Sequence, residues 1–514
     1  MLSGGGLKPK LALRLSGALV DAGLAQEALS VLLDERTDFG GREILRQAWL
    51  ARAQLAAGEV AAARTALDGL LRAGFEDGSD LLEVMSWALG RGERPDAGRA
   101  AHLAERLCVW GLADAAAEAL APFMSGDQAG PDLDKLIAAA FGVMRLAPRK
   151  ARALLESMAP VYAAEGLTEP LRATRQALDG GPDAGVEPSP QDASARRLLL
   201  YACLAEACAA QGLWPAAIAR MDFAGKRGAE PGDALCELAR FVGRDLLGRM
   251  EVRLEPHAGA PRLFDVFNFN GEFAMLQLKL QEMAGWIDRF VLAEADATFT
   301  GLPKRLYFQE QPGAGGTFAD QIVHVVAPEP SDHIAFTWAR EFLQKDSSVA
   351  GLSGCCGPDD LVILSDVDEF TDRAAIEGFD GTLASLELRT FRFFINCEVI
   401  FDRPQLKSAI ARARLVAAHG WNYLRLGAAR YRSAVHLPKA GWHFTSIGDP
   451  QWLARKMQCT SHEEWSYMDR AFFEKRLRRF RQGAIGPGFA RREIDESFPA
   501  SIRESREALA DFIL

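Results

Sequence analysis

The pattern of apolar residues changes near the middle of this 514-residue chain, and that change constrains the fold more than any other feature. Residues 1–250 are rich in alanine and leucine with a helical period, which predicts packed amphipathic helices. Proline and glycine then appear in EVRLEPHAGAPR (251–262), and from Leu263 short apolar runs alternate with helical segments. Because the chain is too long for one hydrophobic core, we expect two domains, at 1–250 and 262–514.

Four glycines in the first half share one register with their neighbours. A leucine stands eight residues before each glycine and an alanine five residues after it. Glycine suits the turn of a helical hairpin because a positive φ is cheap for it, and the small alanine lets the two helices approach closely. This register predicts tetratricopeptide-like repeats stacked as an all-α solenoid. The four glycines are Gly23, Gly58, Gly111 and Gly212.

Stacked helical hairpins present a concave surface to peptides and partner proteins. For this array we expect either that it binds a protein partner or that it simply packs on the next domain, and the sequence favours neither. The stretch from about 179 to 194 is rich in proline, glycine and serine, which predicts a mobile loop inside the array.

The second half has the pattern of an α/β domain. Strands alternating with helices imply a mainly parallel sheet, whose ligands bind beyond the carboxyl ends of the strands. The predicted helices are EFAMLQLKLQEMAGW (272–286) and FTWAREFLQKDSSVAGL (336–352). The predicted strands are RLFDVFNF (262–269), DRFVLAEA (288–295), LYFQE (306–310), QIVHVVA (321–327) and LVILSDVDEF (361–370).

The last predicted strand ends in a crowd of carboxylates. Asp366 and Asp368 are alternate residues of an extended segment, so their side chains can share a face. Two adjacent carboxylates raise one another's pKa and cost stability, and a divalent Mg²⁺ or Mn²⁺ ion removes that cost. A solvated acidic strand end also explains a D-x-D pattern, but its place after a buried strand favours a metal site.

Several segments, taken in order, resemble glycosyltransferase family 17, the family of β-1,4-mannosyl-glycoprotein 4-β-N-acetylglucosaminyltransferase. The resemblance covers about residues 264–465 and leaves out the helical array. It implies a GT-A-type, Rossmann-like domain that transfers N-acetylglucosamine from a UDP-sugar to a glycan or protein-linked sugar acceptor, with inversion and with a divalent metal. The matching segments are FDVFNFNGEFAMLQLKL, DRFVLAEADATFTGLPKRLYF, WAREFLQKD, DDLVILSDVDEF, AGWHFTSIG and KMQCTSHEEW.

The resemblance also implies roles for individual side chains. Asp366 and Asp368 would hold the metal that bridges the donor diphosphate, with His443 as a third ligand or a hydrogen-bond donor to the diphosphate. For the other expected donor-site residues, a solvated, salt-bridged or buried structural role is the open alternative. These residues are Glu294, Asp296, Arg340, Lys345, Trp442 and His462.

An inverting transfer also needs a general base for the acceptor hydroxyl. Glu463 in SHEEW is the first candidate because it falls in a segment that matches the family. Asp402 and Glu398, in FINCEVIFDRP, are competing candidates. Glu369 is expected to orient one of the ligand side chains without binding the metal itself.

Two alternatives to a sugar transferase stay open. One is a haloacid-dehalogenase-type phosphatase, whose nucleophile motif also begins with an apolar strand and D-x-D; Phe370 stands where that motif expects Thr or Val. The other is a non-catalytic repeat scaffold with a degenerate sugar-binding domain.

Charge and composition limit the partners and the cellular compartment that we expect for the protein. A net charge of -10 argues against general nucleic-acid binding. Eight scattered cysteines without a C-x-x-C pair fit reduced thiols, and no apolar run approaches the about 20 residues that span a bilayer. We expect a cytoplasmic, bacterial protein without a transmembrane segment. The basic run FFEKRLRRFRQG (472–483) is expected to be a solvated face, with contact to an anionic glycan, nucleotide or lipid headgroup at a membrane surface as the alternative.

Overall fold

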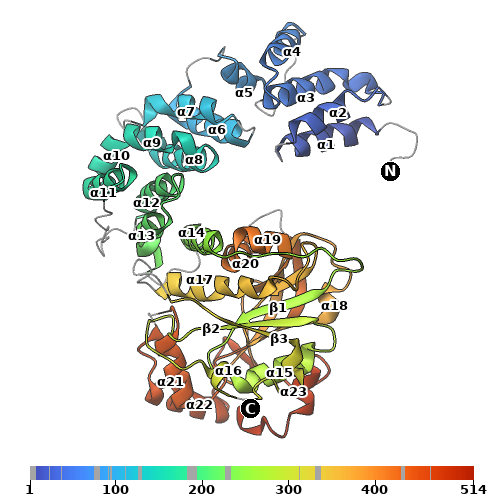
Figure 1. Cartoon of the computed structure of the whole chain (residues 1–514), viewed down its shortest axis with the longest axis vertical. Helices are drawn as coiled ribbons and strands as arrows, with labels where there is room; N and C mark the ends of the chain where they lie inside the picture. Colours follow the sequence, from blue (N-terminus) through green and yellow to red (C-terminus); the bar gives the residue numbers. More distant parts are fainter. Residues whose placement is uncertain are drawn as a thin grey trace. The chain divides into compact units, whose positions relative to one another are not determined.

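The computed structural model of the chain forms two compact units, residues 1–217 and 218–514, called here the N-terminal and C-terminal units (Figure 1). Most of the loop expected at 179–194 lies outside the described residues. The structure describes 7–21, 24–35, 37–73, 81–90, 92, 95–109, 112–124, 130–181, 194–225, 233–311, 313–329, 337–429, 435–462 and 465–514.

The N-terminal unit is built from helical hairpins. Gly58 and Gly212 have φ of +80° and +73°, as expected for the turn after a first helix, and Ala63 is fully buried. Gly23 and Gly111 lie outside the described residues. Helix α1 packs on α2, α3 on α4 and α6 on α7, while the stacking of these pairs into a solenoid stays a prediction. The helices are α1 (Pro9–Asp21), α2 (Ala25–Leu32), α3 (Glu43–Ala56), α4 (Val60–Arg72), α5 (Leu81–Ala88), α6 (Ala97–Val109), α7 (Ala113–Leu120), α8 (Leu133–Leu146), α9 (Pro148–Ser157), α10 (Ala159–Ala164), α11 (Thr168–Leu178) and α12 (Ala195–Ala209), with α13 (Trp214–Gly225) crossing the boundary between the units.

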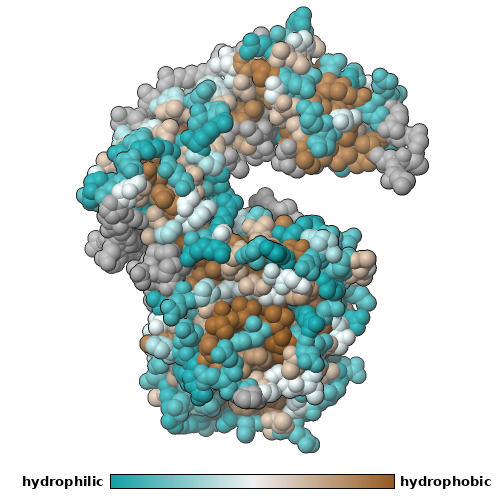
Figure 2. All heavy atoms as spheres, in the orientation of Figure 1, coloured by the Kyte–Doolittle hydropathy of each residue, from teal (hydrophilic) through white to brown (hydrophobic). Residues whose placement is uncertain are grey.

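Hydrophobic side chains are exposed on the first helices of the N-terminal unit. Leu11 and Leu15 on α1 are exposed, as are Ile44 and Leu45 on α3. Figure 2 shows hydrophobic side chains gathered over the α1–α3 part of the chain. Contiguous apolar surface of this kind marks interaction sites, so a protein partner for the repeats stays a proposal.

A ten-stranded mixed sheet forms the centre of the C-terminal unit, in the order β10-β7-β6-β8-β4-β1-β2-β3, with β9 beside β6 and β5 beside β9. The expected parallel arrangement holds for β4, β1, β2 and β3. Strand β8 is antiparallel to both β4 and β6. A short loop, rather than a helical crossover, joins β6 to its antiparallel neighbour β7. The strands are β1 (Leu263–Asn268), β2 (Arg289–Glu294), β3 (Ile322–Val326), β4 (Leu361–Leu364), β5 (Glu369–Thr371), β6 (Leu383–Arg392), β7 (Cys397–Val399), β8 (Leu406–Arg412), β9 (Val435–Thr445) and β10 (Phe489–Arg491).

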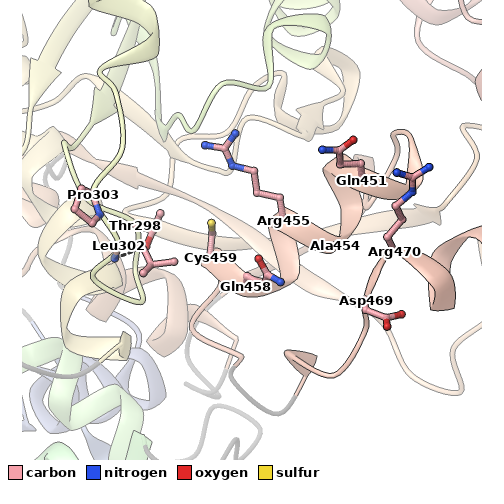
Figure 3. Close-up of a pocket in the computed structure, with 10 residues that line it drawn as sticks. All are labelled: Thr298, Leu302, Pro303, Gln451, Ala454, Arg455, Gln458, Cys459, Asp469 and Arg470. Carbon is pink, nitrogen blue, oxygen red and sulfur yellow. Dashed lines mark hydrogen bonds between the residues drawn. The ribbon is translucent and has the colours of Figure 1, made fainter.

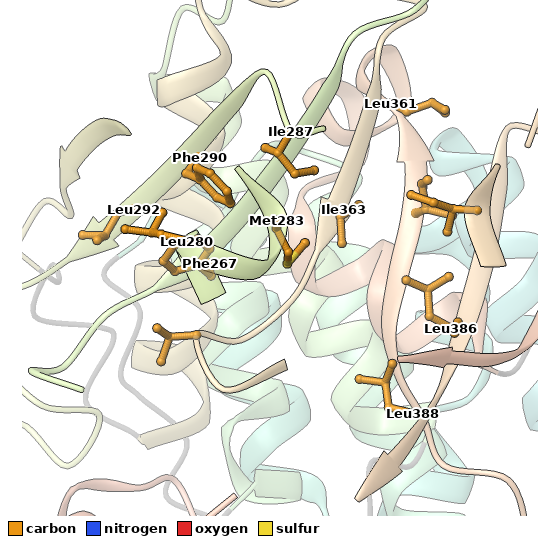
Figure 4. Packing of buried hydrophobic residues seen from close by; sticks show 14 of the residues in the cluster. Phe267, Leu280, Met283, Ile287, Phe290, Leu292, Leu361, Ile363, Leu386 and Leu388 are labelled. Carbon is orange, nitrogen blue, oxygen red and sulfur yellow. The ribbon is translucent and has the colours of Figure 1, made fainter. Parts of the chain in front are cut away.

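Alternate residues of the central strands fill two cores, one on each face of the sheet. Phe267 of β1 packs with Leu280 and Phe290 in one core (Figure 4), while Val266 packs with Val362 and Trp421 in the other. The helices of this unit are α14 (Asp233–Arg249), α15 (Phe273–Met283), α16 (Tyr307–Glu310), α17 (Thr337–Ser347), α18 (Arg373–Ile376), α19 (Ala413–His419), α20 (Trp421–Ala428), α21 (Pro450–Cys459), α22 (Arg470–Arg481) and α23 (Ala500–Glu504).

Helix α14 has the alanine-leucine composition of the first half, yet it packs on α17, α19 and α20 of the C-terminal unit. The domain bounds expected from the sequence, 1–250 and 262–514, stay a prediction for independently folding domains. Within the described ranges, no helix combines the length and apolar character that crossing a bilayer requires.

The segment LYFQE, predicted as a strand, instead contains the short helix α16. The buried carboxylate of Glu294, at the end of β2, accepts hydrogen bonds from the backbone amides of Phe308 and Gln309. These are amides of the first turn of α16, which have no partner within the helix. A long-range contact therefore decides the local structure.

Candidate active site

The carboxylate of Asp366, just beyond β4, is held between two cations. Its Oδ1 lies 2.9 Å from Lys345 Nζ of α17, and its Oδ2 lies 2.9 Å from an Arg425 nitrogen of α20. Both cations also lie 4.8 Å from the ring of Trp421, which fixes their direction. Burial acts to raise the pKa of Asp366, but Arg425 and Lys345 outweigh it and hold that pKa far below its usual range.

Asp368 has a separate set of partners. Lys456 Nζ of α21 lies 3.1 Å from its Oδ2, and His443 Nε2 of β9 lies 3.6 Å from its Oδ1. Lys456 Nζ is also 4.0 Å from Glu272 Oε1, at the carboxyl end of β1. Burial acts to raise the pKa of Asp368, but Lys456 and His443 outweigh it and lower that pKa. Burial of Glu272 raises its pKa in spite of Lys456.

A fully buried lysine supports the turn that carries both aspartates. Lys279 Nζ, from α15, lies 2.9 Å from Asp265 Oδ2 on β1. It donates hydrogen bonds to Ser365 Oγ and to the carbonyl oxygens of Asp366 and Glu369, at 2.8, 3.1 and 2.7 Å. One ammonium thus ties α15, β1 and the D-x-D turn together.

Glu369 closes this turn from the other side. It accepts a hydrogen bond from the Asp366 amide at 2.9 Å and one from Ser408 Oγ at 2.7 Å. It also pairs with Arg425 at 2.7 Å, so that Arg425 is held against Asp366. Glu369 faces the protein interior and orients Arg425.

The donor atoms fit a divalent ion at Asp368 and His443 better than at Asp366. Among the described residues, no three or more His, Cys, Asp or Glu side chains converge on a point that would hold a metal ion. Asp366 has both oxygens in ion pairs. Asp368 Oδ1 and His443 Nε2 are 3.6 Å apart, a separation at which both can bind one cation that takes its other ligands from water and phosphate.

Three of the expected donor-site residues lie around the β2 edge. Glu294 is buried and its Oε1 lies 2.8 Å from His324 Nε2, so its carboxylate makes contacts inside the protein. Asp296 is exposed directly beyond β2. Arg340 of α17 packs its guanidinium against Gly301, leaving no room there for a Cβ. Glu294 thus contacts His324 and Arg340 contacts Gly301, whereas Asp366 and Asp368 pair with Lys345, Arg425 and Lys456.

Trp442 and His462 make structural contacts. Trp442 Nε1 donates to the carbonyl of Ser497 at 2.9 Å, and the neighbouring His443 points to the other face of β9. The ring of His462 stacks on Trp465, with centroids 4.1 Å apart, and meets the edge of Trp338 at 5.0 Å.

The three candidate general bases differ in their structural environment. Glu398 lies between Arg389 and Arg492; burial opposes the shift, but the two guanidinium groups hold the pKa of Glu398 below its usual range. Asp402 is exposed in the loop after β7. Glu463 lies outside the described residues.

A pocket of about 440 Å³ borders α21 (Figure 3). Its lining includes Thr298 and Leu302 from the loop after β2, Arg455 and Gln458 from α21, and Arg470 at the start of α22. Lys456, next to Arg455 on the same helix, reaches Asp368, so α21 connects the pocket with the carboxylate cluster. Amide and guanidinium groups of this kind hydrogen-bond hydroxyl-rich ligands.

An acidic cluster paired with lysine and arginine side chains beyond parallel strands is the arrangement expected of an enzyme that handles a phosphorylated donor, and comparison with known proteins places the matching region among the glycosyltransferases. Residues 249–481 match the model of glycosyltransferase family 17, which confirms the family expected from the sequence. The chain is 33% identical over 134 residues to the β-1,4-mannosyl-glycoprotein 4-β-N-acetylglucosaminyltransferases of Rattus norvegicus and Homo sapiens. The Mus musculus protein is 32% identical over the same length.

These alignments cover 24% of this chain and 24% of each relative, so the chain spans about a quarter of the length of the curated relatives it matches. No solved structure matches the chain.

Proposed function

We propose that the C-terminal unit is a GT-A-type, inverting glycosyltransferase that moves N-acetylglucosamine from a UDP-sugar to a glycan or protein-linked sugar acceptor. The cationic and carboxylate groups around Asp366 and Asp368 carry the proposal, since they stand at the carboxyl ends of β1 and β4 inside the family match. The donor sugar is inferred from the relatives, which are named as N-acetylglucosaminyltransferases.

Departure of a nucleoside diphosphate requires positive charge at the place where negative charge develops. Lys456 can supply that charge. Burial acts to lower its pKa, but Asp368 and Glu272 outweigh burial and raise that pKa, so the ammonium stays charged. Asp368 and His443 would hold a Mn²⁺ or Mg²⁺ ion, which when bound would neutralise diphosphate charge. In this proposal Asp366 holds Lys345 and Arg425 in place beside the donor.

The base and the acceptor site complete the proposal. Glu463 remains the proposed general base, because the arginine pair of Glu398 stabilises its ionised form and makes it a weak proton acceptor. We assign the pocket beside α21 to the acceptor sugar, because the amide of Gln458 and the guanidinium of Arg455 line it next to the helix that carries Lys456.

Nucleotide release tests the proposal. The full chain is incubated with Mn²⁺ and a panel of nucleotide sugars, alongside Asp368→Ala and, as a matched control, Asp380→Ala at an exposed position outside the site. Release of UDP from UDP-N-acetylglucosamine that is lost only in Asp368→Ala supports sugar transfer. Phosphate release from monoesters instead supports the phosphatase alternative, and no turnover in either assay supports the scaffold.

A further inference from the structure

Helix α22 presents opposite chemistry on its two faces. Phe473, Leu477 and Phe480 are buried at helical spacing, with Phe480 against Phe393 and Phe394. On the other face Lys475, Arg478 and Arg479 are exposed, and in the part of the chain that the structure describes none of the three forms an ion pair. The surface over α21 and α22 is hydrophilic in Figure 2. The run from 470 to 481 holds six basic residues and one acidic residue.

Exposed apolar side chains flank both ends of this helix. Tyr467, just before α22, is 68% exposed and its ring lies 6.1 Å from that of Phe472. Beyond the far end, the Ile400 amide donates to the Gly488 carbonyl at 2.9 Å, which places Ile400 and Phe401 beside the turn that follows α22. Ile400 is 47% exposed and Phe401 42% exposed.

We propose that α22, together with Tyr467, Ile400 and Phe401, docks the protein on an anionic lipid bilayer. Unpaired cations on one helical face attract acidic headgroups, and the flanking apolar side chains can enter the interface between headgroups and acyl chains. A nucleic acid supplies phosphates for the cations but no apolar medium for Ile400. The proposal is independent of sugar transfer.

Vesicle sedimentation of the full chain tests this docking. Vesicles of phosphatidylcholine alone are compared with vesicles containing about 30% phosphatidylglycerol, at low and high salt. The triple variant Lys475→Gln/Arg478→Gln/Arg479→Gln removes the exposed cations. Its matched control, Arg172→Gln/Arg253→Gln/Arg414→Gln, removes the same charge from exposed arginines that pair with Glu169, Glu251 and Asp359.

We expect binding to the anionic vesicles only, weakened by salt. At about 1 kcal/mol per cation, the triple variant should bind on the order of 100-fold more weakly, with the control unchanged. Tyr467→Ser/Phe401→Ser should weaken binding at high salt, where the apolar contribution dominates. Absence of binding, equal binding to both vesicles, or equal loss in the control overturns the proposal. Tighter binding to duplex DNA than to the anionic vesicles overturns it in favour of a nucleic-acid partner.

Discussion

Lys456 Nζ lies 3.1 Å from Asp368 Oδ2 and 4.0 Å from Glu272 Oε1, so a single ammonium group neutralises two largely buried carboxylates, one in the turn after β4 and one at the start of α15. In the proposed reaction the same group meets the leaving diphosphate. Because of these two roles, we expect the loss of Lys456 to lower turnover more than the loss of any other cation of the site.

Lys456→Met should lower nucleotide release by on the order of 100- to 1,000-fold, the usual cost of removing one donor that stabilises developing charge. Steady-state release of UDP measures this effect. Lys475→Met, which removes an exposed lysine of α22, serves as the control and should match wild type. Equal activity of Lys456→Met and wild type would contradict the role given to this lysine.

Lys279→Met should act on stability, because it leaves Asp265 fully buried without its cation. Breaking a buried ion pair from one side costs about 3–5 kcal/mol in the free energy of unfolding. Urea denaturation followed by tryptophan fluorescence measures the loss. The double variant Lys279→Met/Asp265→Leu removes both charges and should regain much of it; failure of the double variant to recover any stability would show that the pair is not the cause.

Asp366→Ala and Asp368→Ala should differ in metal binding. Both carboxylate oxygens of Asp366 form ion pairs with Lys345 and Arg425, so Asp366→Ala should leave Mn²⁺ affinity nearly unchanged. Asp368→Ala should weaken Mn²⁺ binding at least about tenfold. Calorimetric titration of Mn²⁺ in the presence of UDP makes the comparison. Equal weakening in both variants would place the ion between the two aspartates.

Asp346 predicts a pH dependence of stability. It is fully buried on α17, where its Oδ1 accepts from the Asn422 amide at 2.9 Å, and burial raises its pKa to about 7 despite that bond. The folded state therefore favours the protonated acid. This stabilisation is complete below the ordinary pKa near 4 and is lost as the pH rises to 7, at a total cost of about 4 kcal/mol.

Asp346→Asn should flatten the dependence between pH 4 and 7 and should be more stable than wild type at pH 8. The free energy of unfolding in urea at pH 5 and pH 8 tests this expectation. Asp402→Asn, at an exposed site, should keep the wild-type slope. A parallel pair of curves for Asp346→Asn and wild type would assign the slope to other groups.

Glu463→Gln tests the proposed base. Loss of a general base costs about 100- to 10,000-fold in transfer. Mn²⁺ affinity should stay at the wild-type value, which separates loss of the base from loss of the metal site. If Asp402→Asn lost the same activity and Glu463→Gln none, the base would be reassigned to Asp402.

Strongly apolar segments made much of the C-terminal unit predictable. Strands β1, β2, β3 and β4 and helices α15 and α17 fall within their predicted segments because each contains a continuous apolar stripe or run. The segment at 306–310 could not be predicted in this way, because its helical turn depends on the carboxylate of Glu294 on another strand.

The candidate site was predictable only where its residues stand near one motif. Asp366 and Asp368 follow a buried strand, and that position identified them. Arg425 and Lys456 reach the same place from distant helices. Arg425 has no local signal, and Lys456 stands out only as the first residue of the matching segment KMQCTSHEEW. Lys279 does have one: it interrupts the apolar stripe of α15 beside Leu276 and Leu280, a place where a lysine is costly unless it has a buried partner.

Helix α14 has a practical consequence for anyone who wishes to isolate or transplant the C-terminal unit. A fragment that begins after the change of sequence pattern near residue 250 would lack the helix that covers α17 and α20. Those two helices carry Lys345 and Arg425, so the bared apolar surface would lie behind the very cations that hold Asp366. The smallest portable unit therefore starts before Asp233, within what reads as the repeat region.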